Sequence, residues 1–245
     1  MENNKPVIEI KNLHKTFGEH KVLNGVNATI NKGEDVVILG RSGGGKSVTI
    51  KCLVGLEQPD KGSIKVFGTE MTKLNGKELN EIRSRIGFMF QNGALYDSMS
   101  IRQNLTFALK HHDKNITAEA VEEKITEALD NVGLLDAIDK MPSELSGGMR
   151  KRIGMARTLI VKPEIILYDE PTSGLDTITA REISELMVAI QKKHKTTSLI
   201  ITHDLACAKL TADRIIVLMD GIIVAEGTYA ELEKSKDPMI KSFFL

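Results

Sequence analysis

The feature that most constrains the fold is a glycine-rich octapeptide that follows an apolar run. Residues 40–47 read Gly-Arg-Ser-Gly-Gly-Gly-Lys-Ser and match the pattern G-x-x-x-x-G-K-[ST] in full. The preceding run, Val36-Val37-Ile38-Leu39, is typical of a strand buried on both faces. We expect a helix to open inside the octapeptide and to run from about Lys46 to Leu56. A strand, a glycine-rich turn and a helix in this order predict a P-loop.

The residue types of this segment suit a nucleotide phosphate chain. Glycines let several backbone N–H groups converge on one anion, and the helix N-terminus adds partial positive charge. Lys46 can reach the β- and γ-phosphates, and the Ser47 hydroxyl can hold Mg²⁺. The residues expected to bind the nucleotide are Gly40, Arg41, Ser42, Gly43, Gly44, Gly45, Lys46, Ser47 and Val48. This pattern alone does not separate kinases, GTPases, helicases and transport ATPases.

A second buried strand, Ile165–Tyr168, ends in two carboxylates, Asp169 and Glu170. Asp169 is suited to orient Mg²⁺, and Glu170 is suited to accept a proton from the attacking water. Adjacent strand residues point to opposite faces, so the pair needs different roles or a bend after Asp169. An acidic turn that merely ends a strand is the alternative, and the P-loop favours the catalytic interpretation.

The rest of the chain predicts an α/β fold with a mostly parallel sheet covered on both faces. Ser198–Thr202 is a third buried strand, and Asp220-Gly221 is a tight-turn signal between two strands. From about residue 92 to 153 the pattern is mostly helical. We therefore expect one domain over residues 1–245, in which residues 1–91 and 156–245 form the core and residues 92–155 form an inserted helical subdomain.

Composition excludes several classes of protein. The 33 Lys and Arg residues balance 33 Asp and Glu residues, which argues against nucleic acid as a partner. No apolar run approaches the roughly 18 residues of a membrane span, and the N-terminus lacks the apolar stretch of a secretory signal. Cys52 and Cys207 are predicted to be small core residues. We expect a soluble, cytoplasmic protein that reaches a membrane only through a partner.

Leu145-Ser146-Gly147-Gly148-Met149 resembles the signature motif of ATP-binding-cassette (ABC) ATPases. The family's other motifs follow its order along essentially the whole chain. The resemblance implies a P-loop NTPase with a RecA-like core and an N-terminal antiparallel β-subdomain. It implies that Phe17 stacks on adenine and that the Q-loop residue Gln91 senses Mg²⁺ and the γ-phosphate. The remaining matches are the D-loop Ser173-Gly174-Leu175-Asp176, which would couple two sites, and His203, the switch histidine that contacts the γ-phosphate.

The family resemblance also implies a dimer of two copies of the chain. Ser146, Gly147 and Gly148 precede a helix and so form a second anion-binding N-terminus. In the family, two subunits pair head to tail, and the P-loop of one and the signature of the other enclose ATP. Met149 replaces the more usual glutamine of the signature, and Phe17 replaces the commoner tyrosine while retaining an aromatic face. As alternatives, Phe17 is a core aromatic and His203 a hydrogen-bonded histidine at a strand end.

The segment after Gln91 bears on the subfamily. In ABC transporters this region receives a short helix of the membrane permease, and the apolar Ala94, Leu95, Tyr96 and Met99 suit such a groove or the core of the helical subdomain. Residues 88–95, Met149 and the ending 237–244 resemble the ATPase of Mla-type phospholipid transporters, which work with MCE-type lipid-binding proteins. We therefore expect a subunit at the inner face of the cell membrane, held there by a permease. The alternatives are a transporter of another small solute and a soluble ABC ATPase of the iron–sulfur cluster assembly type.

Overall fold

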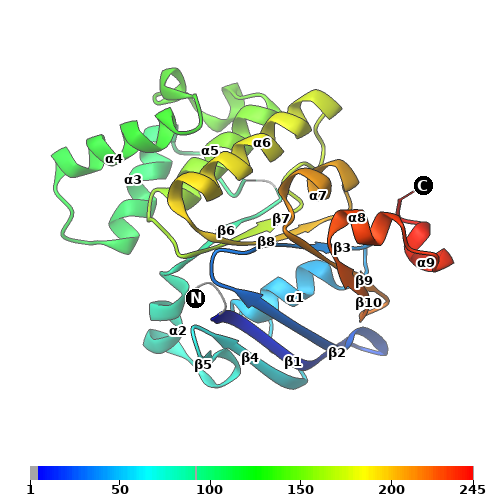
Figure 1. Cartoon of the computed structure of the whole chain (residues 1–245). Coiled ribbons are helices and arrows are strands. Elements are labelled where there is room, and N and C mark those ends of the chain that lie inside the picture. Colours follow the sequence, from blue (N-terminus) through cyan, green and yellow to red (C-terminus); the bar gives the residue numbers. More distant parts are fainter. Residues whose placement is uncertain (1–4, 92, 245) are drawn as a thin grey trace.

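The computed structural model describes residues 5–91 and 93–244, and its main element is a mixed, mostly parallel β-sheet (Figure 1). Among these residues the sheet has six strands in the order β10-β9-β3-β8-β7-β6. Neighbouring strands are parallel, except that β10 pairs antiparallel with β9. The strands are β3 (Asp35–Leu39), β6 (Ile86–Met89), β7 (Ile165–Asp169), β8 (Thr197–Thr202), β9 (Arg214–Met219) and β10 (Ile222–Gly227). The expected α/β fold is confirmed.

A smaller antiparallel sheet lies on one side of the large sheet (Figure 1). Its strand order within the described chain is β2-β1-β4-β5, and its register contains several irregularities between β1 and β2. The strands are β1 (Pro6–Phe17), β2 (His20–Asn31), β4 (Lys61–Val66) and β5 (Thr69–Glu70). This sheet is the N-terminal antiparallel subdomain expected from the family resemblance.

The helices divide between the two faces of the large sheet. In the view of Figure 1, α1 lies below the sheet beside the antiparallel strands, whereas α5, α6 and α7 lie above it. The segment 92–155 contains α3, α4 and most of α5, so the expected limit of the helical subdomain at residue 155 falls inside a helix. The helices are α1 (Lys46–Leu53), α2 (Gly76–Arg83), α3 (Ile101–His112), α4 (Ala118–Asp130), α5 (Gly147–Leu159), α6 (Thr177–His194), α7 (Leu205–Thr211), α8 (Tyr229–Glu233) and α9 (Pro238–Lys241), with short 3-10 turns at Met71–Lys73, Leu135–Ala137 and Pro142–Glu144.

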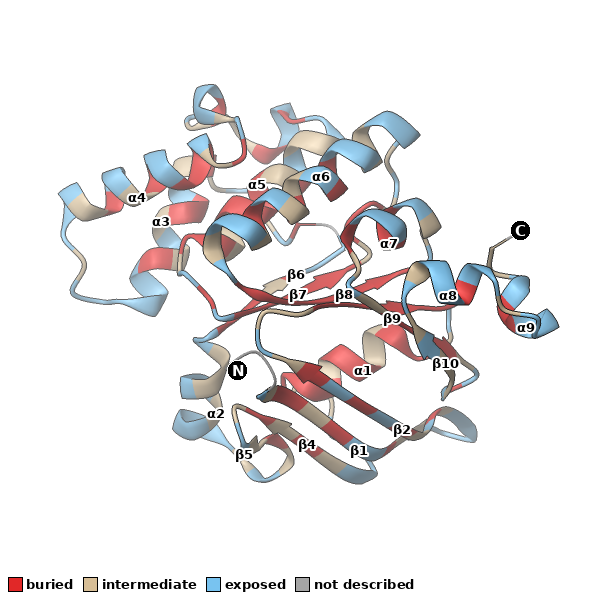
Figure 2. Cartoon of the chain, in the orientation of Figure 1, coloured by how far each residue is buried: buried red, intermediate tan, exposed pale blue. Residues whose placement is uncertain are grey.

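Two hydrophobic cores meet at the large sheet because successive strand side chains point to opposite faces. On β3, Val37 and Leu39 belong to the core shared with the helical segment, whereas Val36 and Ile38 belong to the core shared with α1 and the antiparallel sheet. All residues of β3, β7 and β8 are buried (Figure 2). Continuous apolar runs in these strands thus reflect burial on both faces.

Two helices end next to residues with a left-handed backbone, and one of them ends earlier than its sequence pattern predicts. Helix α1 ends at Leu53 rather than Leu56, because Gly55 adopts a left-handed φ of 68° and its N–H donates to the Cys52 carbonyl. Helix α5 ends at Leu159, and Lys162 has a φ of 52°. Local turn geometry, which apolar spacing does not report, sets both ends.

The tight turn and the burial of both cysteines agree with the sequence predictions. Asp220 and Gly221 have φ angles of 46° and 76°, which suit a tight turn between antiparallel β9 and β10. Cys52 and Cys207 are free and buried, and burial raises the pKa of each thiol to about 11. Over residues 5–91 and 93–244, no helix has the length and apolar character needed to cross a membrane.

Candidate nucleotide-binding and hydrolysis site

The octapeptide connects the central strand β3 to helix α1, as the sequence predicts. Gly45 precedes the helix with a left-handed φ of 94°, and a Cβ atom there would lie 2.6 Å from the Val22 carbonyl oxygen. Only glycine fits this turn. The buried Lys46 folds back over the loop, and its Nζ donates to the carbonyl oxygens of Gly40 at 2.9 Å and Arg41 at 3.1 Å. The loop therefore holds a cation at its centre.

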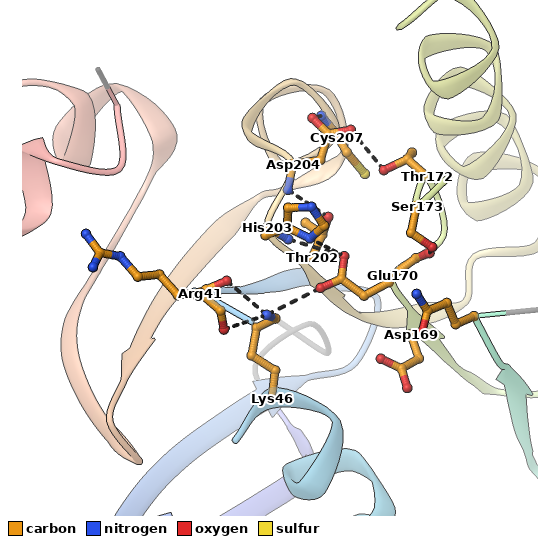
Figure 3. Close-up of polar contacts among 12 residues, drawn as sticks. Arg41, Lys46, Asp169, Glu170, Thr172, Ser173, Thr202, His203, Asp204 and Cys207 are labelled. Atoms are coloured by element: carbon orange, nitrogen blue, oxygen red, sulfur yellow. Dashed lines mark hydrogen bonds and ion pairs between the residues drawn. The ribbon is translucent and has the colours of Figure 1, made fainter. Parts of the chain in front are cut away.

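The carboxylate of Glu170 joins this cation to the predicted switch histidine (Figure 3). Its Oε1 lies 3.3 Å from Lys46 Nζ, and its Oε2 lies 2.8 Å from His203 Nδ1. Glu170 follows β7 directly and has a left-handed φ of 50°. Of the two alternatives that the sequence left open, different roles or a bend after Asp169, the structure has the bend, and the two carboxylates make different contacts.

Asp169 is bound to the P-loop helix rather than to His203. Ser47 Oγ donates to Asp169 Oδ1 at 2.9 Å. Burial raises the pKa of Asp169, and the neighbouring charge of Glu170 adds to this, while the hydrogen bond from Ser47 opposes it. A buried carboxylate beside a hydroxyl is a set of hard oxygen donors that fits Mg²⁺, whose charge would offset the cost of burying the carboxylate.

The signature residues and the D-loop pack against each other within the chain. Ser146 caps α5, and its Oγ accepts a hydrogen bond from the Met149 N–H at 3.2 Å. A Cβ atom on Gly148 would lie 2.6 Å from Thr179 Cγ2, so this glycine lets the start of α5 approach α6 closely. Asp176 caps α6 by accepting hydrogen bonds from the N–H groups of Ile178 and Thr179. Within residues 5–91 and 93–244, no hydrogen bond joins Ser146, Gly147 or Gly148 to the P-loop, and Ser146 and Gly147 are exposed.

Among the described residues, the side chains of two predicted ligands make no hydrogen bond to Lys46, Asp169 or Glu170. Phe17 ends β1 and is 45% exposed, with Lys15 Nζ 4.9 Å from its ring centre. Gln91 has an exposed side chain, and its carbonyl oxygen is fixed by a hydrogen bond from Lys151. Asn92, the next residue of the predicted Q-loop, lies outside the described residues.

Lys151, which no sequence motif singled out, lies between these segments. The side chain is only 6% exposed, and desolvation lowers its pKa to about 8. A signal was present, because Lys151 precedes the buried Met155 and Leu159 by four and eight residues and so shares their helix face. It also lines a pocket of about 430 Å³ beside Gln91 and Ser173.

This fold and this site define a P-loop NTPase. The ABC transporter family model matches residues 23–173. A probable ribonucleotide transport ATP-binding protein, mkl, of Mycobacterium leprae is 41% identical over 236 residues, which are 96% of this chain and 68% of that protein. A methionine import ATP-binding protein, MetN, of Brucella abortus is 41% identical over 222 residues, which are 91% of this chain and 60% of that protein. The chain thus spans about two thirds of the length of these curated relatives.

Solved structures agree with the sequence comparisons. The ATP-binding cassette MJ0796, described as a dimer in a post-hydrolysis state with ADP and Pi, matches with a TM-score of 0.83 and 31% identity, over 91% of this chain and 98% of that one. The protein cbiO1 of Clostridium perfringens, part of the ABC transporter complex cbiONQ, matches with a TM-score of 0.86 and 28% identity, over 97% and 94%. This chain belongs to the ABC transporter family, as its ATP-binding domain. It is an ATPase that uses ATP with Mg²⁺.

Proposed function

We propose that this chain is the nucleotide-binding subunit of an ABC transporter that uses ATP hydrolysis to move phospholipid between membranes. In this proposal Lys46 is the fixed cation for the phosphates, Glu170 polarises the attacking water, and His203 contacts the γ-phosphate. Phe17 stacks on adenine, and residues 40–48 bind the phosphate chain. Mg²⁺, when bound, stabilises charge on the phosphate oxygens, and its ligands would be Ser47, Gln91 and Asp169.

One observation carries the hydrolysis assignment. A single carboxylate, that of Glu170, contacts both the P-loop lysine and His203. A general base must lie within reach of the water that attacks the phosphate held by that lysine. The orientation of Glu170 supplies this proximity, and Lys46 balances its charge.

The arrangement of the signature supports an ATP-bound dimer. Ser146, Gly147 and Gly148 begin a 13-residue helix whose N-terminus is exposed. A helix N-terminus is suited to bind a phosphate group, and here it would serve the P-loop of a second copy. The dimeric cassette among the solved relatives supports the same arrangement. Asp176, which caps α6 beside this region, would couple the two sites.

An exposed aromatic patch supports docking on integral membrane permease subunits. We define the aromatic patch as Tyr96 and Phe107, which are 43% and 42% exposed. Tyr96 packs edge-on against Phe107 with ring centres 5.1 Å apart, and the Arg157 guanidinium lies 5.2 Å from the Tyr96 ring centre. Exposed aromatics grouped in this way are typical of a surface that binds another protein. Arg157 also donates to the Ala94 carbonyl, and Ala94 lines the same pocket as Gln91, so a docked permease would be close to Gln91.

The phospholipid assignment rests on the resemblance of residues 88–95, Met149 and residues 237–244 to Mla-type ATPases. A second candidate, import of a small solute, is favoured by the names of the relatives, which concern ribonucleotide transport and methionine import. These two relatives are equally identical to this chain although their named solutes differ. The cassette's overall identity therefore carries little information about the solute, and its partners decide between the candidates.

The test is purification of the tagged chain from native membranes in mild detergent, with mass spectrometry of the proteins and lipids that co-purify. We expect permease subunits, an MCE-type protein and bound phospholipid. A Tyr96→Arg variant should lose the permease, whereas Leu56→Arg, at an exposed apolar position outside the aromatic patch, should retain it. Recovery of a permease with a ribonucleotide- or methionine-binding protein would overturn the lipid assignment alone. A soluble complex without any membrane protein would overturn the transporter assignment and favour the iron–sulfur assembly type.

A further inference from the structure

A buried lysine connects three functional segments from the helix that carries the signature. Lys151 lies in the second turn of α5, and its Nζ donates to Gln91 O at 2.6 Å, Glu170 O at 3.0 Å and Ser173 Oγ at 3.4 Å. These acceptors belong to the Q-loop, the catalytic turn and the D-loop. An ammonium group has three protons to donate, so these three acceptors use all of them.

Burying a cation is costly unless its hydrogen bonds are satisfied, and neutral acceptors recover only part of that cost. The three acceptors of Lys151 are neutral oxygens, two of them backbone carbonyls. A neutral apolar side chain would fill this space at lower cost if packing were its only role. The cation at this position therefore points to a function in fixing the loops around it.

The acceptor at Glu170 is the one closest to the chemistry. Its carbonyl oxygen also accepts from the Ser173 N–H at 3.2 Å and from Ser173 Oγ at 2.9 Å, while its own N–H donates to the Ile201 carbonyl at 2.8 Å. These bonds hold Glu170 at a φ of 50°, a backbone conformation that residues other than glycine rarely adopt. That backbone conformation directs the carboxylate to Lys46 and His203.

We propose that Lys151 is a positioning residue for hydrolysis, which fixes the backbones of Glu170 and Gln91 relative to the signature helix α5. This inference rests on the proposed role of Glu170 as general base. Movement of α5 would shift Lys151 and, through its hydrogen bond, the backbone of Glu170. The orientation of the Glu170 carboxylate therefore depends on the position of the signature helix. Without the ammonium group, the Glu170 carbonyl keeps only its two bonds from Ser173, so the backbone that directs the carboxylate to Lys46 is held less firmly.

The test compares Lys151→Met with Lys192→Met, which removes an exposed lysine from α6, in the full-length chain. We expect Lys151→Met to lower kcat about tenfold or more while the Kd for ATP changes less than about threefold, since positioning of the base affects the transition state more than ground-state binding. Lys151→Arg, which retains a cation and donors, should recover part of the loss. Lys192→Met should leave both constants unchanged.

A double-mutant cycle separates positioning from general destabilisation. In a Glu170→Gln background, Lys151→Met should change the residual kcat less than about twofold, because both changes act through the same carboxylate. Independent, multiplicative losses would overturn the proposal, as would a normal kcat for Lys151→Met. If Lys151→Met does not unfold cooperatively, Lys151→Gln is judged by the same measures, and failure of both to fold would assign a structural role and overturn the proposal. Normal turnover by Glu170→Gln alone would instead refute the proposed function of Glu170.

Discussion

Ser47 Oγ and Asp169 Oδ1 lie 2.9 Å apart although 122 residues separate them along the chain. Ser47 stands in the first turn of α1, after β3, and Asp169 ends β7, with β8 between the two strands. Carboxyl ends of parallel strands share one edge of a sheet, so the topology brings the hydroxyl and the carboxylate together. This pair forms part of the proposed Mg²⁺-binding site.

Replacing Asp169 tests that assignment. Asp169→Asn keeps the shape of the side chain but removes its negative charge, so we expect a higher Mg²⁺ concentration at half-maximal ATPase activity and a fall in kcat of about tenfold or more. The measurement is a Mg²⁺ titration of ATP hydrolysis at saturating ATP. Asp139→Asn, an exposed position that contacts Arg102, is the matched control. An unchanged Mg²⁺ requirement for Asp169→Asn would rule out Asp169 as a metal ligand.

Glu170→Gln tests the general base. The amide retains the size of the side chain but cannot accept a proton, so kcat should fall about 10²- to 10⁴-fold. ATP binding should persist, and a dimer should accumulate with ATP because hydrolysis no longer releases it. Single-turnover hydrolysis and size-exclusion chromatography in ATP report the two effects. Substantial hydrolysis by this variant would show that another group activates the water.

Ser146→Arg tests whether each ATP site is shared between two copies. We expect hydrolysis to be lost while ATP binding to the chain changes less than about twofold, because Ser146 has no hydrogen bond to its own P-loop among the described residues. Ser143→Arg, at another exposed serine just before α5, should retain activity. Mixing Ser146→Arg chains with Lys46→Ala chains should restore hydrolysis, since one site of each mixed dimer is then intact. Absence of restoration in a proven mixed dimer would contradict the shared site.

The buried carboxyl group of Asp35, at the start of β3, should make the free energy of unfolding depend on pH. Burial raises its pKa to about 7, with the charges of Asp213 and Glu34 adding to this, and its Oδ1 has no hydrogen-bond partner. The folded state binds this proton more tightly than the unfolded state does, so stability falls as the pH rises from about 4 to 7 and the loss is complete above that range. Asp35→Asn should therefore unfold with a free energy about 2–4 kcal/mol higher than the parent at pH 8, and with little difference at pH 4.

Denaturant unfolding at both pH values measures the effect of Asp35→Asn. The exposed Asp130→Asn is the control for loss of an acidic charge and should change stability by no more than about 0.5 kcal/mol. An equal gain at pH 4 and pH 8 would assign the effect to packing rather than to ionisation.

Residues 40–47 and the buried strands could be predicted because their signals are local. A P-loop is one short segment, and strands buried on both faces read as continuous apolar runs. The bend at Glu170 was one of two alternatives that the sequence left open, because adjacent strand residues point to opposite faces. Long-range relationships could not be predicted in this way. The contact between Lys151 and three separate loops depends on tertiary packing, and β6 has only four residues, too few for a clear periodic pattern.

The ends and caps of helices also could not be predicted from the apolar pattern. Gly55 and Lys162 end α1 and α5 through left-handed backbone conformations, which the apolar spacing does not report. Asp176, expected from the family resemblance to couple two sites, is also the cap of α6. Within one chain its carboxylate is engaged by the N–H groups of that helix, and its proposed role between copies depends on a second chain.

The strand order of the large sheet predicts that the P-loop is more rigid than the segment that contains Gln91. The P-loop follows β3, which pairs on both sides with β8 and β9, whereas Gln91 follows β6, the last strand of the sheet in the described chain. Amide hydrogen exchange should therefore be slowest in β3, where only global unfolding exposes the backbone, and faster in β6. The P-loop is therefore anchored by a strand that is paired on both sides. The segment after β6 follows a strand that is paired on one side within the described residues, so a permease that pulls on this segment would shift it more readily than the loop that binds the phosphates.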